Sequence, residues 1–300
     1  MRVGPRGLWL LVSIGMSGGA CRNVGVPRPE SATTAPPPAP APSPAPPADA
    51  VSADARAAPP TCRVRPLAEI PRKTGGGHTA VWFQDAPVKA LGFEAGLAID
   101  ADGGRNAYRD DDKGLDTIKS ACPPSRKGCW GIVMGPGDQL VRQAPPRQAY
   151  YVSPTSLEDP TKPRTDPARY VDAESIAYVV LPIKTLRDAA RRAGITLGLA
   201  LGDYAVVINR KNGRRAPAIF ADAGPSDRIG EGSIALADAL GIPSSPRHGG
   251  AADHVQIVVF PGSGDGKPHP TPVITAASDA LLTRWGGPAM LDACRTPQGL

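Results

Sequence analysis

Residues 218–237 read Ala-Ile-Phe-Ala-Asp222-Ala-Gly-Pro-Ser-Asp-Arg-Ile-Gly-Glu231-Gly-Ser233-Ile-Ala-Leu-Ala. The apolar run 216–221 predicts a buried strand that ends at Asp222, and the Gly-Pro pair after it predicts a turn. Glu231 follows nine residues later, between two glycines, and a helix-like segment begins at Ser233. The stretch therefore places two carboxylates on the two sides of one short loop, beside small residues that leave room for a ligand.

Two carboxylates on one loop suit the cleavage of a glycosidic bond. One protonated carboxyl group donates to the leaving oxygen, while the other, ionised, activates a water molecule. The same pattern also fits a plain turn with two solvated acids, because Asp and Glu are ordinary beside Gly-Pro turns. The spacing alone leaves both interpretations open.

The amino-acid sequence of this stretch resembles a signature of the fungal-type chitosanases of glycoside hydrolase family 75. Their signature is an Asp-x-Gly-Pro turn followed by Ile-Gly-Glu-x-Ser, which here occupies residues 222–225 and 229–233. The resemblance, which spans residues 75–265, implies an endo-acting, inverting hydrolase of β-1,4-linked glucosamine polymers such as chitosan. It also implies that Asp222 and Glu231 are the catalytic pair, with Glu231 as the acid and Asp222 as the base.

Other acidic and aromatic segments fit the same family in the same order. The segment around Asp100 and Asp102 is similar to an Asp-rich run of the family, although Ala101 stands where the fungal run has a cysteine. Carboxylates bind sugar hydroxyls or the ammonium group of glucosamine, so we expect substrate contacts here and at several other positions. The expected substrate-binding residues are Asp100, Asp102, Tyr151, Asp203 and Asp227.

We expect no metal ion and no cofactor. The Asp100 run could supply oxygens to calcium or form a plain turn, but Asp111 stands where a calcium loop has its bidentate Glu. The four histidines lack the spacing of a zinc helix, and no nucleotide-binding fingerprint or nucleophile elbow is present. Aromatic residues that could stack on sugars are scarce, at 5% of the chain.

The first 61 residues predict export rather than folded structure. Residues 1–21 combine a basic start, a short apolar run and small residues, as in a signal peptide. Cys21 follows Gly-Gly-Ala, which predicts lipidation of Cys21 and an outer or cell-surface lipoprotein, with ordinary secretion as the alternative. Residues 22–61 are rich in Pro and Ala and predict an extended tether.

Residues 62–300 are long enough for one well-packed domain, which we expect to be the catalytic domain. It holds Cys62, Cys122, Cys129 and Cys294, an even number that predicts two disulfides in an exported chain. Three pairings are possible. Cys122 and Cys129 enclose a short loop, so we pair them with each other, which leaves Cys62–Cys294 to join the two ends of the domain.

The domain is expected to be mainly β with inserted helices, forming a β-barrel of the double-psi type. Short apolar segments bounded by turn residues predict strands at 79–83, 95–99, 176–181, 197–201, 205–208, 216–221 and 255–260. Periodic segments with caps predict helices at 185–193, 233–240 and 274–285.

Charge leaves the identity of the polymer open. The chain carries a net charge of +6, whereas chitosan is a polycation that calls for an acidic groove. A basic surface would also suit the anionic polymers of a bacterial envelope. The alternatives are therefore a murein-cleaving enzyme on the same barrel or a non-catalytic polysaccharide-binding module. We expect a monomer that binds a polysaccharide, does not bind nucleic acid, and meets a membrane only through a lipid anchor.

Overall fold

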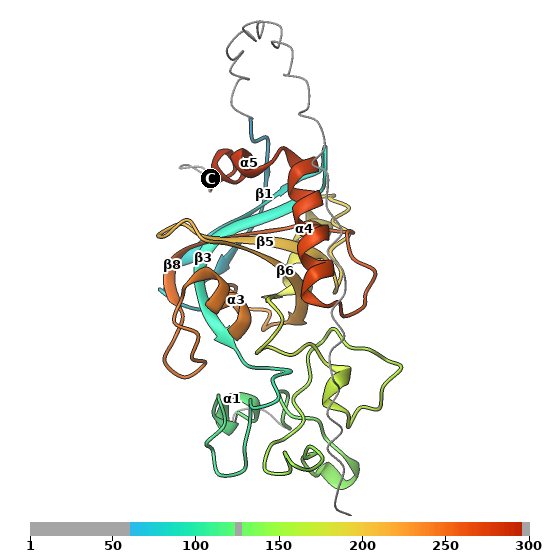
Figure 1. Cartoon of the computed structure of the whole chain (residues 1–300). Coiled ribbons are helices and arrows are strands. Elements are labelled where there is room, and N and C mark those ends of the chain that lie inside the picture. Colours follow the sequence, from blue (N-terminus) through green and yellow to red (C-terminus); the bar gives the residue numbers. More distant parts are fainter. Residues whose placement is uncertain (1–60, 124–127, 296–300) are drawn as a thin grey trace, which may run out of the picture. The chain divides into compact units, whose positions relative to one another are not determined.

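Within the described residues, six strands close into a barrel (Figure 1). The computed structural model describes residues 61–123 and 128–295. The ring runs β3-β7-β4-β6-β5-β8 and closes where β8 pairs with β3, while β1 and β2 extend it as a hairpin. The strands are β1 (Arg65–Pro71), β2 (His78–Gln84), β3 (Ala90–Asp100), β4 (Tyr178–Leu181), β5 (Tyr204–Asn209), β6 (Arg215–Ala223), β7 (Glu231–Ser233) and β8 (Ala251–Val259).

Helices are few and lie outside the barrel, so the mainly β barrel with inserted helices is confirmed. They are α1 (Ile118–Ala121), α2 (Ile183–Arg192), α3 (Ile234–Leu240), α4 (Thr271–Trp285) and α5 (Pro288–Ala293), with short 3-10 turns at Pro136–Asp138 and Pro167–Arg169. The predicted caps are confirmed for α3. The Ser233 side chain accepts a hydrogen bond from the Leu236 amide, and Gly241 ends the helix with a left-handed backbone, φ 64°.

Two expectations about local structure are wrong. Residues 197–201 form no strand, although Leu197 and Leu199 are buried in the barrel core. Gly198 and Gly202 have φ of 71° and 90°, a left-handed backbone that interrupts an extended strand. Glu231 does not sit in a loop but begins the short strand β7, which inserts between β3 and β4.

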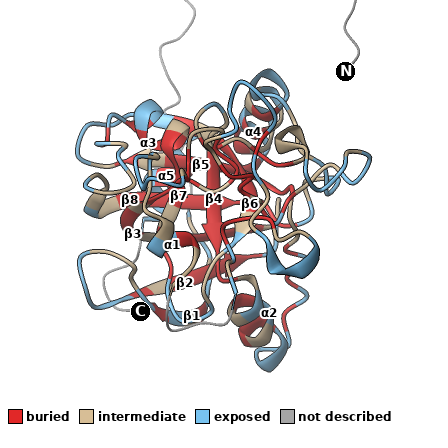
Figure 2. Cartoon of the chain, turned by 90° about the horizontal axis from the view of Figure 1, so that it is seen from below, coloured by how far each residue is buried: buried red, intermediate tan, exposed pale blue. Residues whose placement is uncertain are grey.

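Alternating side chains give the barrel an apolar interior and an apolar outer coat. The interior includes Phe93, Leu97, Val179 and Phe220, and the barrel strands appear as the buried centre in Figure 2. On the outer side, α4 packs against β5 and β6. The long connection from β3 to β4 has little regular structure and gathers at one end of the barrel (Figure 1).

Both disulfides pair as expected. Cys62 bonds Cys294, with Cα atoms 5.1 Å apart, and Cys122 bonds Cys129, with Cα atoms 4.1 Å apart. The first bridge joins Cys62, three residues before β1, to Cys294, the residue after α5. It lies in a second apolar cluster, where Trp82 stacks on Trp285 with ring centroids 6.2 Å apart.

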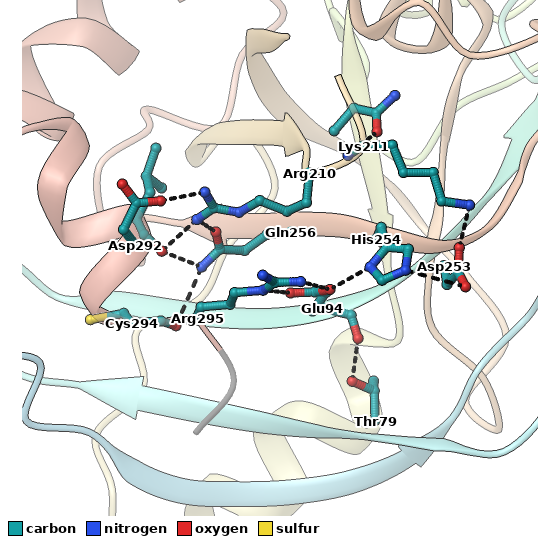
Figure 3. Close-up of polar contacts among 12 residues, drawn as sticks. Thr79, Glu94, Arg210, Lys211, Asp253, His254, Gln256, Asp292, Cys294 and Arg295 are labelled. Atoms are coloured by element: carbon teal, nitrogen blue, oxygen red, sulfur yellow. Dashed lines mark hydrogen bonds and ion pairs between the residues drawn. The ribbon is translucent and has the colours of Figure 1, made fainter. Parts of the chain in front are cut away.

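A polar network fastens the C-terminal helix to the barrel (Figure 3). Glu94 on β3 accepts hydrogen bonds from two nitrogens of the Arg295 guanidinium group, at 2.9 and 3.2 Å. Its carboxylate also lies 3.3 Å from the His254 ring on β8. Burial raises the pKa of Glu94, but the hydrogen bonds and charges of Arg295 and His254 outweigh it and leave the pKa below its ordinary value. Glu94 therefore stabilises the fold in its ionised form.

Glu94→Gln should lower the free energy of unfolding at pH 7 by about 1–2 kcal/mol, because a mostly buried charged acceptor is lost. A lowered pKa contributes stability above the unfolded pKa and loses it as pH falls through the folded pKa. The difference from wild type should therefore shrink on acidification. Urea unfolding between pH 7 and 3 measures it, with the exposed Glu69→Gln as control. A difference that stays constant over this range would contradict the role of the charge.

The described residues all belong to one compact unit, Arg56–Leu300. Among them, no helix combines the length and apolar character needed to cross a membrane. The signal peptide, the lipidation of Cys21 and the tether fall outside the described residues and stay predictions. The domain boundaries likewise stay predictions.

Candidate functional site

The two loop carboxylates lie in one row across three neighbouring strands. Val180 at the centre of β4 pairs with Asp222 on β6 and with Glu231 on β7. Directly paired residues direct their side chains to the same face of a sheet. Asp222 and Glu231 therefore share the outer face of the barrel with Val180, which packs in the outer apolar cluster. Strands lie about 4.8 Å apart, so the two backbones are separated by roughly 9–10 Å.

A β-bulge puts Asp222 on that outer face. Val179 pairs with Phe220, but Val180 pairs with Asp222, so Ala221 is the extra residue in β6. With regular pairing, Ala221 would face Val180 and Asp222 would face Leu181, whose side chain is in the barrel interior. Bulges commonly re-aim a side chain beside an active site, and here the bulge brings a carboxylate out of the core.

Gly224 lets the loop after Asp222 pass closely over the strand below. A Cβ atom at this position would lie 2.9 Å from Val180 Cγ1 and 3.8 Å from Glu231 Oε2. A larger residue would collide with Val180 and fill the space beside the Glu231 carboxyl group. The close approach to Val180 therefore explains why a glycine stands at position 224 of the turn.

Ser156 lies in the long connection between β3 and β4 and forms hydrogen bonds with Asp222. Its amide and its hydroxyl group both donate to Asp222 Oδ1, at 2.7 and 2.6 Å, and its hydroxyl oxygen accepts from the Ala223 amide at 3.0 Å. Both donors use one oxygen of the carboxylate. The arrangement fixes the orientation of Asp222.

Asp100, the last residue of β3, and Asp102, two residues later, form an acidic cluster with Asp222. Carboxylate oxygens of Asp100, Asp102 and Asp222 lie within 4.8 Å of one another. Asp102 accepts from the Tyr108 hydroxyl group at 2.7 Å and from Ser153 Oγ at 3.3 Å. These oxygens could receive a cation, whether a metal ion or an ammonium group, or could share a proton.

Mutual repulsion and burial make these acids hard to ionise. Burial raises the pKa of Asp102 to about 7, and the charge of Asp222 adds to the effect. Burial, followed by the charge of Asp102, raises the pKa of Asp100 well above its ordinary value. Burial also raises the pKa values of Asp222 and Glu231. Groups with raised pKa values gathered in one place are typical of functional sites.

Glu231 forms an ion pair with Lys73. The distance from Lys73 Nζ to Glu231 Oε1 is 2.5 Å, and the side chains are 28% and 13% exposed. The charge and the hydrogen bond of Lys73 lower the pKa of Glu231, but burial acts in the opposite direction and is the larger effect.

Of the expected substrate-binding residues, Asp100 and Asp102 join the catalytic candidates, and the other three do not. Asp203 is fully buried, and its carboxylate accepts from the backbone amides of residues 200, 263 and 264. The Tyr151 ring is buried under the Arg142 guanidinium group, 4.9 Å from its centroid. Asp227 is exposed in the loop and forms an ion pair with Arg228 at 3.0 Å.

The sequence interpretation did not identify Lys73 or Ser156 as part of the site. Ser156 lies within residues 75–265, which resemble the family, but no motif singled it out. Lys73 precedes Gly75-Gly76-Gly77, which indicates a turn but not what the turn approaches.

A family model matches the part of the chain that contains the two loop carboxylates. Residues 146–280, just under half of the chain, match the model of the fungal chitosanases of glycosyl hydrolase group 75. The matched range contains Asp222, Glu231 and Ser156, whereas Lys73, Asp100 and Asp102 precede it. No curated protein matches the chain. Residues 146–280 are therefore similar to the fungal chitosanases of glycosyl hydrolase group 75, and this domain indicates a glycoside hydrolase of the chitosanase type.

Proposed function

We propose that the protein is an endo-acting, inverting chitosanase in which Asp222 and Glu231 act as the catalytic pair. The observation that carries the proposal is their common pairing with Val180, which puts both carboxylates on one face of the barrel. Inverting glycosidases keep their carboxyl groups about 6.5–9.5 Å apart, to leave room for a water molecule. Two strand spacings between the backbones are compatible with that range.

The contacts favour Asp222 as the base and Glu231 as the acid. Asp222 Oδ1 accepts both hydrogen bonds from Ser156, which favour the ionised carboxylate against the effect of burial, and we assign Oδ2 to the attacking water molecule. Glu231 is 13% exposed, and burial raises its pKa, so it can hold the proton that the leaving oxygen requires.

Charge supports a glucosamine polymer as the substrate. The cluster of Asp100, Asp102 and Asp222 contrasts with the positive net charge of the chain, and an ammonium group would relieve the repulsion among these three acids. Trp130 is 68% exposed. It precedes Gly131, where an added Cβ atom would lie 2.9 Å from Asp102 Oδ1. We infer that this indole offers a stacking surface to a sugar ring next to the acids.

Hydrolysis of a chitosan hexamer by the full chain tests the proposal. New reducing ends, with the product's new end appearing first as the α-anomer in proton NMR spectra, are expected for inversion of a β-linkage. An initial β-anomer would overturn the inverting mechanism. Release of fragments from murein without cleavage of chitosan would favour the murein-cleaving enzyme. Binding without cleavage of either polymer would favour the non-catalytic module.

A further inference from the structure

The turn between β1 and β2 runs alongside the segment that leads to Glu231. The Ile229 amide donates to the Pro71 carbonyl at 3.0 Å, and the Lys73 amide donates to the Ile229 carbonyl at 2.8 Å. Arg72 and Ile229 form a parallel bridge. These backbone bonds fix Lys73 beside the chain two residues before Glu231.

Glycines let the turn and this segment approach the barrel closely. A Cβ atom on Gly96 would lie 2.0 Å from Thr74 Oγ1, and one on Gly230 would lie 2.8 Å from the Gly96 carbonyl oxygen. Gly230 also has φ of 101°, which non-glycine residues rarely adopt. Thr74 Oγ1 in turn donates to the Ala251 carbonyl at 2.9 Å. The backbone of the turn that contains Lys73 is therefore packed tightly against the barrel.

The ion pair is sheltered as well as close. Lys73 Nζ lies 2.5 Å from Glu231 Oε1, and less than a third of either side chain is exposed. Charged hydrogen bonds of this length are stronger than neutral ones and are screened less by salt when sheltered. The contact leaves Glu231 Oε2 available for a proton.

We propose that Lys73 is a positioning residue of the site, whose ammonium group holds the Glu231 carboxyl group in place and controls its charge state. The inference deepens the proposed chitosanase function and rests on it for the kinetic consequence. It also makes the β1–β2 turn, which precedes the part of the chain that matches the family model, a working part of the site.

Other charged groups also act on the pKa of Glu231 and limit the effect of Lys73 on it. Arg228 lies in the preceding loop and favours the ionised form, whereas the acids on β3 and β6 disfavour it. The groups that face Glu231 are Lys73, Arg228, Asp100, Asp102 and Asp222. Among them, Lys73 is the one with a direct hydrogen bond to its carboxyl group.

Removal of the ammonium group should move one limb of the pH profile. An opposite charge within 4–6 Å favours ionisation, so Lys73→Met should raise the pKa of Glu231 by about one unit. If Glu231 is the acid, activity is lost when it deprotonates, and the alkaline limb of kcat should move to higher pH by about one unit. If Glu231 were the base, the acidic limb would move up instead. The direction therefore also assigns the two roles.

Lys73→Met, Lys73→Arg and the exposed Lys184→Met form the test set. We expect Lys73→Met to lower kcat on chitosan hexamer about tenfold, since a displaced acid loses orientation, with little change in KM. Lys73→Arg should restore most of kcat, and Lys184→Met should match wild type. A pH profile of Lys73→Met that superimposes on the wild-type profile would overturn the proposal.

A readout that needs no catalysis separates this proposal from the proposed function. The Glu231 carboxyl carbon can be titrated by carbon-13 NMR in the full chain, with Glu231→Gln used to assign its signal. A higher pKa in Lys73→Met supports the inference even if wild type does not cleave chitosan, and an unchanged pKa in a folded variant rejects it. Circular dichroism and thermal unfolding report whether each variant is folded.

Discussion

Asp222→Asn should reduce the rate of chitosan hydrolysis by about a thousandfold, with little change in KM. The amide keeps the size of the side chain and can still accept from Ser156, but it cannot take a proton from water. General acid–base groups typically contribute 10²–10⁴ in rate, which sets this magnitude. Glu231→Gln should show a loss of similar size, because an amide cannot donate the proton that the leaving oxygen needs. Initial rates of reducing-end release measure both effects.

Two exposed residues provide matched controls. Asp238→Asn on α3 and Glu69→Gln on β1 make the same chemical changes away from the row of acids, and both should keep wild-type rates. Unfolding midpoints separate a loss of chemistry from a loss of fold. Full activity of Glu231→Gln on murein would favour a mechanism with a single carboxylate and would rule out the proposed pair.

Loss of the Cys62–Cys294 bridge should lower the free energy of unfolding by about 5 kcal/mol. The bridge spans a sequence separation of 232 residues, and a loop of that length restricts the unfolded chain strongly in the chain-entropy model. Cys294 is also fully buried beside Trp285, so Cys62→Ala/Cys294→Ala loses packing as well. Urea unfolding at pH 7 measures the change.

The second bridge gives an internal comparison. Cys122–Cys129 spans a separation of seven residues, so the same model gives a loss of only about 2 kcal/mol for Cys122→Ala/Cys129→Ala. Equal losses for the two double variants would mean that loop closure does not determine the stabilisation.

Much of the barrel could be predicted because its strands are short, apolar and bounded by turn residues. The segments of β2, β5, β6 and β8 carry such patterns, and α3 carries both of its caps in the sequence. The segment 197–201 shows the limit of this reasoning, because its alternating leucines are buried as a strand's would be. Two glycines with positive φ prevent the backbone from extending there. Pattern alone reports burial more reliably than backbone conformation.

The site was predictable in its acids but not in the groups that support them. Asp222 and Glu231 lie close in sequence, so one motif contains both. Lys73 lies 158 residues before Glu231, and its approach depends on backbone pairing that residue types do not encode locally. The bulge at Ala221 is equally hidden, because an apolar run of six residues gives no sign of which one is unpaired.

That one extra residue suggests how such a barrel can gain or lose activity during evolution. Side chains alternate between the two faces of a strand, so a shift of one position exchanges interior and exterior for everything that follows it. If β6 paired with β4 without the bulge, Ala221 would face Val180 and Asp222 would turn toward the apolar interior, although every functional residue would still be present. An alignment that counts the acids would still score such a protein as an enzyme. Searches for active relatives should therefore examine the pairing register of this strand as well as its acids.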